Sequence, residues 1–142
     1  MTPTALRISR RFNASPEQLF DAWLDPKVVA RWLFTSPASE AHTVEIDRQV
    51  DGEWVITDRR DGVDYTALGE YLEIKRPHRL VFSFGMPQFS DQSATVTVEI
   101  APDGDGSVLT LTQSDLPVAH HEPTRQGWEA MFDMLDGVLA PR

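Results

Sequence analysis

Hydrophobic and polar residues alternate near the start of the chain, and the pattern then changes to one with helical spacing. Residues 6–12 alternate and predict a β-strand. Ser15 and Pro16 form a helix-start signal, because serine caps a helix well and proline suits its first position. The apolar residues that follow predict two short helices, separated by Asp25-Pro26. These apolar residues are Leu19, Phe20, Trp23, Leu24, Val28, Val29 and Trp32.

From His42 onward the apolar residues recur at every second position, which is typical of β-strands. Turn sequences interrupt the alternation, and those around Asp51-Gly52 and Asp61-Gly62 are typical of hairpins. Gly69 lies inside an expected strand, where a glycine indicates a bulge or the close approach of another backbone. Six strands in hairpin series are expected at residues 44–47, 54–56, 65–74, 79–84, 95–100 and 108–113.

The end of the chain returns to helical spacing. A loop over residues 114–123 is expected to lead into a helix with one apolar side. That side comprises Trp128, Met131, Phe132, Leu135, Val138 and Leu139. Hairpin-connected strands form antiparallel sheets, and a long sheet tends to curl over the helices that cover it. The sequence therefore predicts an α+β domain in which a curved seven-stranded antiparallel sheet surrounds a long C-terminal helix, with two short helices after the first strand.

The amino-acid composition excludes several classes of function. The 142 residues suit one domain, 1–142, and carry a net charge of −9 with no cysteine. The missing cysteines exclude disulfides, thiolate metal sites and a cysteine nucleophile. The acidic balance argues against nucleic acid or anionic membrane as a partner, because both bind basic surfaces. No apolar run approaches a membrane span, and the first residues do not resemble a signal peptide, so we expect a cytoplasmic protein without membrane insertion.

Several motifs occur in the order that is typical of one known superfamily. They are FNASPEQLFDAW at 12–23 with Asp25-Pro26 and Trp32, GEYLEI at 69–74 with RLVF at 79–82, TVTV at 95–98, LTLT at 109–112, and Gly127-Trp128. The set resembles the START-like, or SRPBCC, helix-grip superfamily, and within it the branch named after the activator of heat-shock-protein-90 ATPase. The resemblance covers nearly the whole chain and implies the helix-grip fold.

The chain departs from the family pattern at two places. Members commonly carry an Arg and a Gly-Gly pair where this chain has residues 49–52, and often a His where it has Gln113. A function that depends on this His does not transfer. Relatives include carriers of lipids and hydrophobic ligands, polyketide cyclases and chaperone activators, so the resemblance implies the fold more firmly than the function.

The leading hypothesis is that a small hydrophobic or aromatic molecule binds between the sheet and the terminal helix. The resemblance implies that the curvature of a helix-grip sheet leaves a space there, which apolar side chains would line. The expected wall residues are Trp54, Ile56, Phe82, Phe84, Trp128, Met131 and Leu135. Residues expected at the entrance are Trp32, Phe34, Met86 and Phe89. The alternative to this hypothesis is that these side chains simply fill the core.

Two other functions stay open. A cyclase or hydratase would need an acid or base, for which Tyr65, Tyr71 and Asp58 are the candidates. A protein-interaction role would involve a chaperone partner, as the family name suggests, and a homodimer also stays open. We expect no cofactor, because nucleotide-binding motifs are missing from the sequence. We expect no metal, because the aspartates of the 58–64 segment lack the alternate-residue spacing of a calcium loop. His120-His121-Glu122 is expected in an exposed loop and the Asp58–Asp64 segment in a solvated hairpin.

Overall fold

The expected order of elements is confirmed by the computed structural model, which describes residues 5–36, 38–86 and 93–139. The strands are β1 (Leu6–Phe12), β2 (Ala41–Ile46), β3 (Glu53–Arg60), β4 (Val63–Lys75), β5 (Arg79–Phe84), β6 (Ala94–Asp103) and β7 (Gly106–Gln113). The helices are α1 (Pro16–Asp21), α2 (Pro26–Val29), the 3₁₀ turn η1 (Val118–His120) and α3 (His121–Leu139). None of the described helices has both the length and the apolar character needed to cross a membrane.

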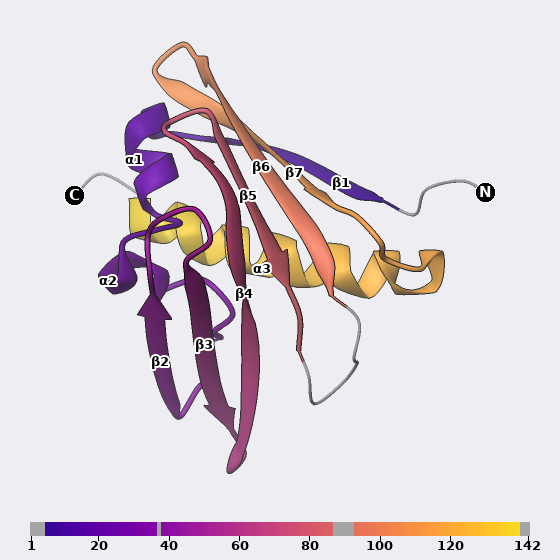
Figure 1. Cartoon of the computed structure of the whole chain (residues 1–142). Helices are drawn as coiled ribbons and strands as arrows, with labels where there is room; N and C mark the ends of the chain where they lie inside the picture. Colours follow the sequence, from indigo (N-terminus) through magenta and orange to yellow (C-terminus); the bar gives the residue numbers. More distant parts are fainter. Residues whose placement is uncertain (1–4, 37, 87–92, 140–142) are drawn as a thin grey trace.

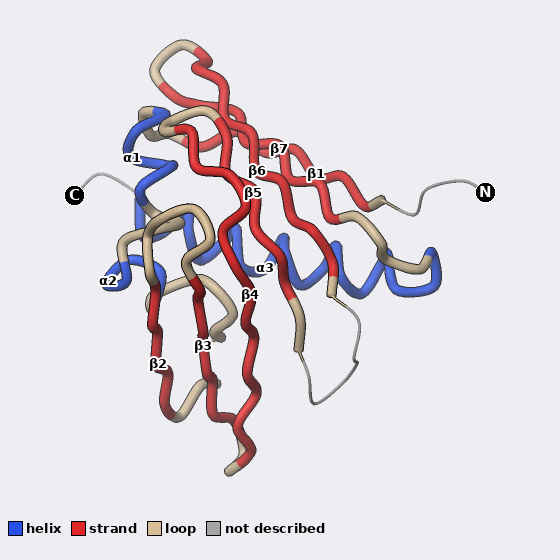
Figure 2. The backbone as a smooth tube through the Cα atoms, in the orientation of Figure 1, coloured by secondary structure: helices blue, strands red, loops and turns tan. Residues whose placement is uncertain are grey.

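The seven strands form one antiparallel sheet that curves around α3. Their order across the sheet is β1-β7-β6-β5-β4-β3-β2, so all neighbours except β1 and β7 are consecutive in the chain. Figure 1 shows α3 lying across the inner face of the sheet, with α1 and α2 beside its C-terminal end. The tube in Figure 2 shows that β2, β3 and β4 extend past the helix on one side. The N-terminal half of α3 is therefore left without a covering helix.

Both short helices begin at the residues that the sequence indicated. Ser15 Oγ accepts a hydrogen bond from the Gln18 backbone N–H at 3.1 Å, and Asp25 Oδ1 accepts one from the Lys27 N–H at 3.0 Å. Each cap satisfies a backbone donor that has no partner inside the helix. A proline follows each cap directly, where its missing N–H costs the helix nothing.

The start of α3 differs from the expected loop over residues 114–123. The helix begins at His121 and includes Pro123, because a proline in the first helical turn removes no intrahelical hydrogen bond. His121 Nε2 lies 2.9 Å from the carbonyl oxygen of Leu116, and this hydrogen bond ties the helix start to the preceding segment. His120 ends η1, so only this part of the His-His-Glu sequence lies outside α3.

Gly69 lies where the backbones of β4 and β5 approach each other closely. An isolated bridge joins Leu68 to Gly85, and a Cβ atom on Gly69 would overlap the carbonyl oxygen of Ser83. The expected close backbone approach is thus confirmed. The bulge lies further along the strand, where the register shifts between Tyr71 and Glu73.

The core is richest in aromatic side chains where the short helices meet the sheet and α3. Trp23 and Trp32 are in edge contact with ring centres 4.7 Å apart. Trp23 also contacts Phe82 at 6.0 Å and Phe132 at 6.4 Å. All four side chains are buried. This half of the inner face is therefore filled by side chains rather than open to a ligand.

Candidate functional site

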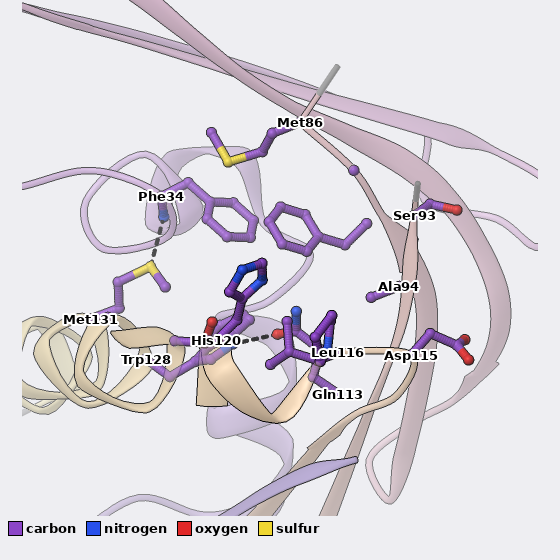
Figure 3. A pocket seen from close by; sticks show the side chains of 15 residues that line it. Phe34, Met86, Ser93, Ala94, Gln113, Asp115, Leu116, His120, Trp128 and Met131 are labelled. Carbon is purple, nitrogen blue, oxygen red and sulfur yellow. Dashed lines mark hydrogen bonds between the residues drawn. The ribbon is translucent and has the colours of Figure 1, made fainter. Parts of the chain in front are cut away.

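A partly open pocket of about 480 Å³ lies at the other end of the inner face, beside the first half of α3. Residues from the ends of β5 and β7, the start of β6, the segment before α3 and the helix itself line it (Figure 3). Its apolar lining comprises Phe34, Phe84, Met86, Leu116, Trp128 and Met131. The volume is typical of small-molecule sites, which occupy about 300–1,000 Å³.

One wall of the pocket consists of aromatic rings in nearly parallel planes. The Phe34 and Phe84 ring centres are 4.9 Å apart, with 9° between their planes. Trp54 continues the group behind them, 5.7 Å from Phe34 with an angle of 7°. Trp128 meets Phe34 from the helix side at 5.6 Å and 59°. A flat aromatic molecule could stack against such a wall, because offset stacking is a favoured arrangement of aromatic groups.

Phe34 reaches the wall through an unusual backbone conformation. Its φ angle is +52°, in the left-handed region that a bulky residue rarely adopts. Its backbone N–H donates to Met131 Sδ at 3.0 Å, which joins the turn after α2 to α3 (Figure 3). Strained residues of this kind occur preferentially at functional sites.

The helix contributes one face to the pocket. Thr124, Gly127, Trp128 and Met131 all line the pocket, and their spacing of three, one and three residues places them on one side of α3. Apart from its two neighbours and the backbone of α3 itself, Gly127 has no described atom within 4 Å of the position that a Cβ would occupy. The missing side chain therefore leaves space at this point of the wall.

The polar lining is sparse, and Gln113 is its buried member. Gln113 ends β7 and is 3% exposed, and its Oε1 accepts a hydrogen bond from Trp128 Nε1 at 2.9 Å. Asp115 and His120 are exposed at the mouth. Asp115 also has a left-handed φ angle of +58°, which aspartate tolerates better than most residues.

The expected ligand residues fall into two groups in the structure. Five of them border the pocket: Phe34, Phe84, Met86, Trp128 and Met131. Five others are buried in the core and do not border it: Trp32, Trp54, Ile56, Phe82 and Leu135. Trp54, Ile56 and Phe82 line a crevice of about 10 Å³, which is about the size of one water site, and Trp54 also borders a hollow of about 280 Å³ over β3 and β4. Phe89 lies outside the described residues.

Sequence reasoning did not identify several residues that border the pocket. Gln113 was expected among a few inward polar residues that could orient a carbonyl or enol, but not as part of the pocket wall, and Leu116 and His120 were expected in the loop over residues 114–123. Gly127 carried a weak signal, because a glycine in a helix lowers its stability and often has a packing reason.

The three candidate acid–base residues lie away from the pocket. Burial raises the pKa of the Tyr71 phenol, which opposes its use as a base near neutral pH. Asp58 is 2% exposed, and its Oδ1 lies 3.2 Å from His42 Nδ1. Its Oδ2 lies 2.9 Å from Arg60 Nε without the alignment of a hydrogen bond. The Arg60 guanidinium in turn lies over the Tyr65 ring, 4.5 Å from the ring centre.

This buried ionic cluster has a structural explanation, since each charged member lies near an opposite charge or an aromatic face. Within the described ranges, no group of three or more His, Asp or Glu side chains is placed to hold a metal ion.

Solved structures with the same fold cover almost the whole chain. Protein CV1439 from Chromobacterium violaceum is 24% identical with a TM-score of 0.84, covering 97% of this chain and 98% of its own. Protein Mll3558 from Rhizobium loti is 24% identical with a TM-score of 0.77, covering 96% of each chain. A protein of unknown function, SA2116 from Staphylococcus aureus, is 19% identical with a TM-score of 0.80, covering 96% of this chain and 94% of its own. At these identities the likeness shows the fold alone.

The family comparison is more specific. The search of curated proteins found no significant relative. The model of the family described as activator of Hsp90 ATPase homolog 1-like protein matches residues 13–140, which includes both the short helices and α3. The seven-stranded sheet and the long C-terminal helix are the helix-grip arrangement of that family. The chain therefore belongs to the activator of Hsp90 ATPase homolog 1-like family.

Proposed function

We propose that this protein binds a small hydrophobic or aromatic molecule in the pocket beside the first half of α3. The observation that carries the proposal is the pocket of about 480 Å³ with a wall of nearly parallel rings from Phe34 and Phe84. Met86 and Met131 add flexible side chains that adapt to the shape of a ligand. The family fold commonly binds hydrophobic ligands, which agrees with such a role.

A binding role without catalysis explains the site better than a cyclase or hydratase activity does. Tyr65, Tyr71 and Asp58 do not border the pocket, so none of them could contact a molecule bound there. A general acid or base must come within hydrogen-bond reach of the reacting group. The titratable side chains that do line the pocket, Asp115 and His120, are both exposed at its mouth. We therefore favour a carrier or sensor of a small molecule over an enzyme.

Filling the pocket from the helix tests the proposal. In a Gly127→Leu variant, the new side chain would enter the open space on the pocket face of α3. The fold should keep its stability, because leucine favours a helix by up to about 1 kcal/mol over glycine. Titration with the neutral fluorescent probe N-phenyl-1-naphthylamine should give saturable binding to the wild type and at least tenfold weaker binding to the variant.

Gly137→Leu is the matched control. Gly137 also lies in α3 with open space around its Cβ position, but it does not border the pocket. This variant should gain the same helix propensity and bind the probe like the wild type. Absence of saturable binding to the wild type would contradict the proposal, and so would equal loss of binding in both variants.

A further inference from the structure

The orientation of the Gln113 side-chain amide follows from its neighbour. The indole Nε1–H of Trp128 can only donate a hydrogen bond, so the Gln113 atom 2.9 Å away must be the accepting oxygen. The amide nitrogen is thereby directed away from Trp128. Figure 3 shows this side chain entering the pocket from the end of β7, with its oxygen toward Trp128. The orientation is thus set by chemistry and not by a choice between two similar atoms.

The side-chain amide nitrogen of Gln113 can donate hydrogen bonds within the pocket. In the described part of the chain, no side chain or carbonyl accepts a hydrogen bond from its Nε2. The residue is nevertheless 3% exposed and borders the pocket. The amide nitrogen itself is not among the described side-chain atoms that are fully buried without a partner, so it is accessible from the pocket. The two N–H groups therefore suit a ligand atom that accepts hydrogen bonds.

The position of this donor is rigid. The Gln113 backbone pairs with Leu6 of β1 on one side and with Val96 of β6 on the other. Strands on both sides hold the main chain, and the bond to Trp128 holds the side chain. Donors that are fixed before binding lose little entropy when a ligand arrives.

The charges around the pocket indicate which acceptor fits. The described lining residues include the carboxylate of Asp115 and no Lys or Arg. An anionic ligand would approach that carboxylate without a lysine or arginine partner, whereas a neutral carbonyl oxygen offers two lone pairs and no charge. We propose that the ligand is a neutral aromatic carbonyl compound whose oxygen accepts from Gln113 Nε2 while its ring stacks on Phe34 and Phe84. This inference rests on the proposed function and names the class of ligand.

A matched pair of probes separates the hydrogen bond from apolar binding. 2-Acetylnaphthalene and 2-isopropenylnaphthalene have the same ring system and nearly the same size, but only the first carries a carbonyl oxygen. The wild type should bind the ketone about 3- to 10-fold more tightly than the alkene, as expected for one net hydrogen bond. In a Gln113→Met variant, which keeps an unbranched side chain without a donor, the two probes should bind equally.

The control is Gln126→Met, the same substitution on α3 at a residue that does not border the pocket. It should keep the wild-type preference for the ketone. Equal binding of both probes by the wild type overturns this inference and leaves the proposed function intact. A ketone preference that survives in Gln113→Met also overturns it. If the wild type binds neither probe, the proposed function fails and this inference fails with it.

A second measurement applies if Gln113→Met does not fold, because it uses the wild type alone. The aromatic ketone 6-propionyl-2-(dimethylamino)naphthalene emits at longer wavelength when its carbonyl accepts a hydrogen bond. Bound emission shifted to longer wavelength than that in an apolar, non-donating solvent supports the inference. Bound emission that matches such a solvent overturns it.

Discussion

Two substitutions at Phe34 separate the free-energy cost of its left-handed backbone from the packing of its ring. The residue adopts φ +52° and packs its ring in parallel with those of Trp54 and Phe84. Replacing it with alanine removes the ring but keeps a Cβ in the left-handed conformation. Replacing it with glycine removes the ring and the Cβ together. The stability difference between these two variants therefore reports the backbone alone.

At an ordinary loop position the alanine variant would be more stable than the glycine variant. At position 34 we expect the reverse. A Cβ in the left-handed region costs about 1–2 kcal/mol, which glycine does not incur. Glycine loses about 0.4–1 kcal/mol relative to alanine, because its unfolded chain is more flexible. The balance leaves Phe34→Gly about 0.5–1 kcal/mol more stable than Phe34→Ala. For a domain of this size that difference corresponds to about 2–3 °C in Tm.

Urea unfolding followed by tryptophan fluorescence measures both variants against the wild type. Each should be less stable than the wild type, because each loses the contacts of a ring in the wall, and each should bind N-phenyl-1-naphthylamine more weakly. A Phe34→Ala variant as stable as Phe34→Gly, or more stable, would refute the assignment of strain to this residue. Wild-type probe affinity in both variants would show that the ring does not contribute to binding.

Three further predictions concern the rest of the fold. Gly69→Ala should lower the free energy of unfolding by about 2 kcal/mol or more in urea, because the new Cβ overlaps the Ser83 carbonyl oxygen. Phe132→Ala should cost about 3–5 kcal/mol in the same assay, because the residue is fully buried among aromatic rings. Asp21→Asn should lower the free energy of unfolding near neutral pH but not in acid. The hydrogen bond from Arg76 lowers the pKa of Asp21, so its contribution is full above the unfolded pKa and disappears as pH falls through the folded one.

Each of these has an outcome that contradicts it. Wild-type stability of Gly69→Ala would mean that β4 and β5 can separate without cost at this point. A loss below about 1 kcal/mol for Phe132→Ala would indicate that the core collapses around the deleted ring. For Asp21→Asn, the urea midpoints of wild type and variant are compared at pH 7 and at about pH 3. If the difference between the two urea midpoints is equal at both pH values, the Asp21–Arg76 pair is not its cause.

The sheet could be predicted from sequence because its pattern is local and repeated. Most strands alternate, the hairpins at Asp51-Gly52 and Asp61-Gly62 have recognisable turns, and a shift by one residue would expose the apolar face. Gly69 also gave a usable signal, since only a close approach or a bulge explains a glycine inside such a strand. The start of α3 was misjudged because Pro123 was taken as the end of a loop, although proline is also favoured in a first helical turn.

The site was harder to predict because inward-facing residues look alike in sequence. Trp54 and Phe84 both lie on inward-facing strand positions, yet Trp54 is buried in the core and Phe84 borders the pocket. What separates them is the position of α1 and α2, which lie beside the C-terminal end of α3 and help to fill that half of the inner face (Figure 1). This placement depends on long-range packing. Periodicity along the chain does not encode it.

Three features that border the pocket are unusual for the elements that carry them. Gly127 weakens α3 by about 1 kcal/mol relative to alanine, and Phe34 is held in a left-handed conformation. Gln113 keeps an amide N–H donor that no described residue accepts and that is accessible from the pocket. Left-handed φ angles also occur at Asp51 and Asp61, and Trp23 Nε1 is buried without a partner in the described structure, all outside the pocket lining. What the proposed ligand site would explain is that three such features, on separate elements, border one apolar space.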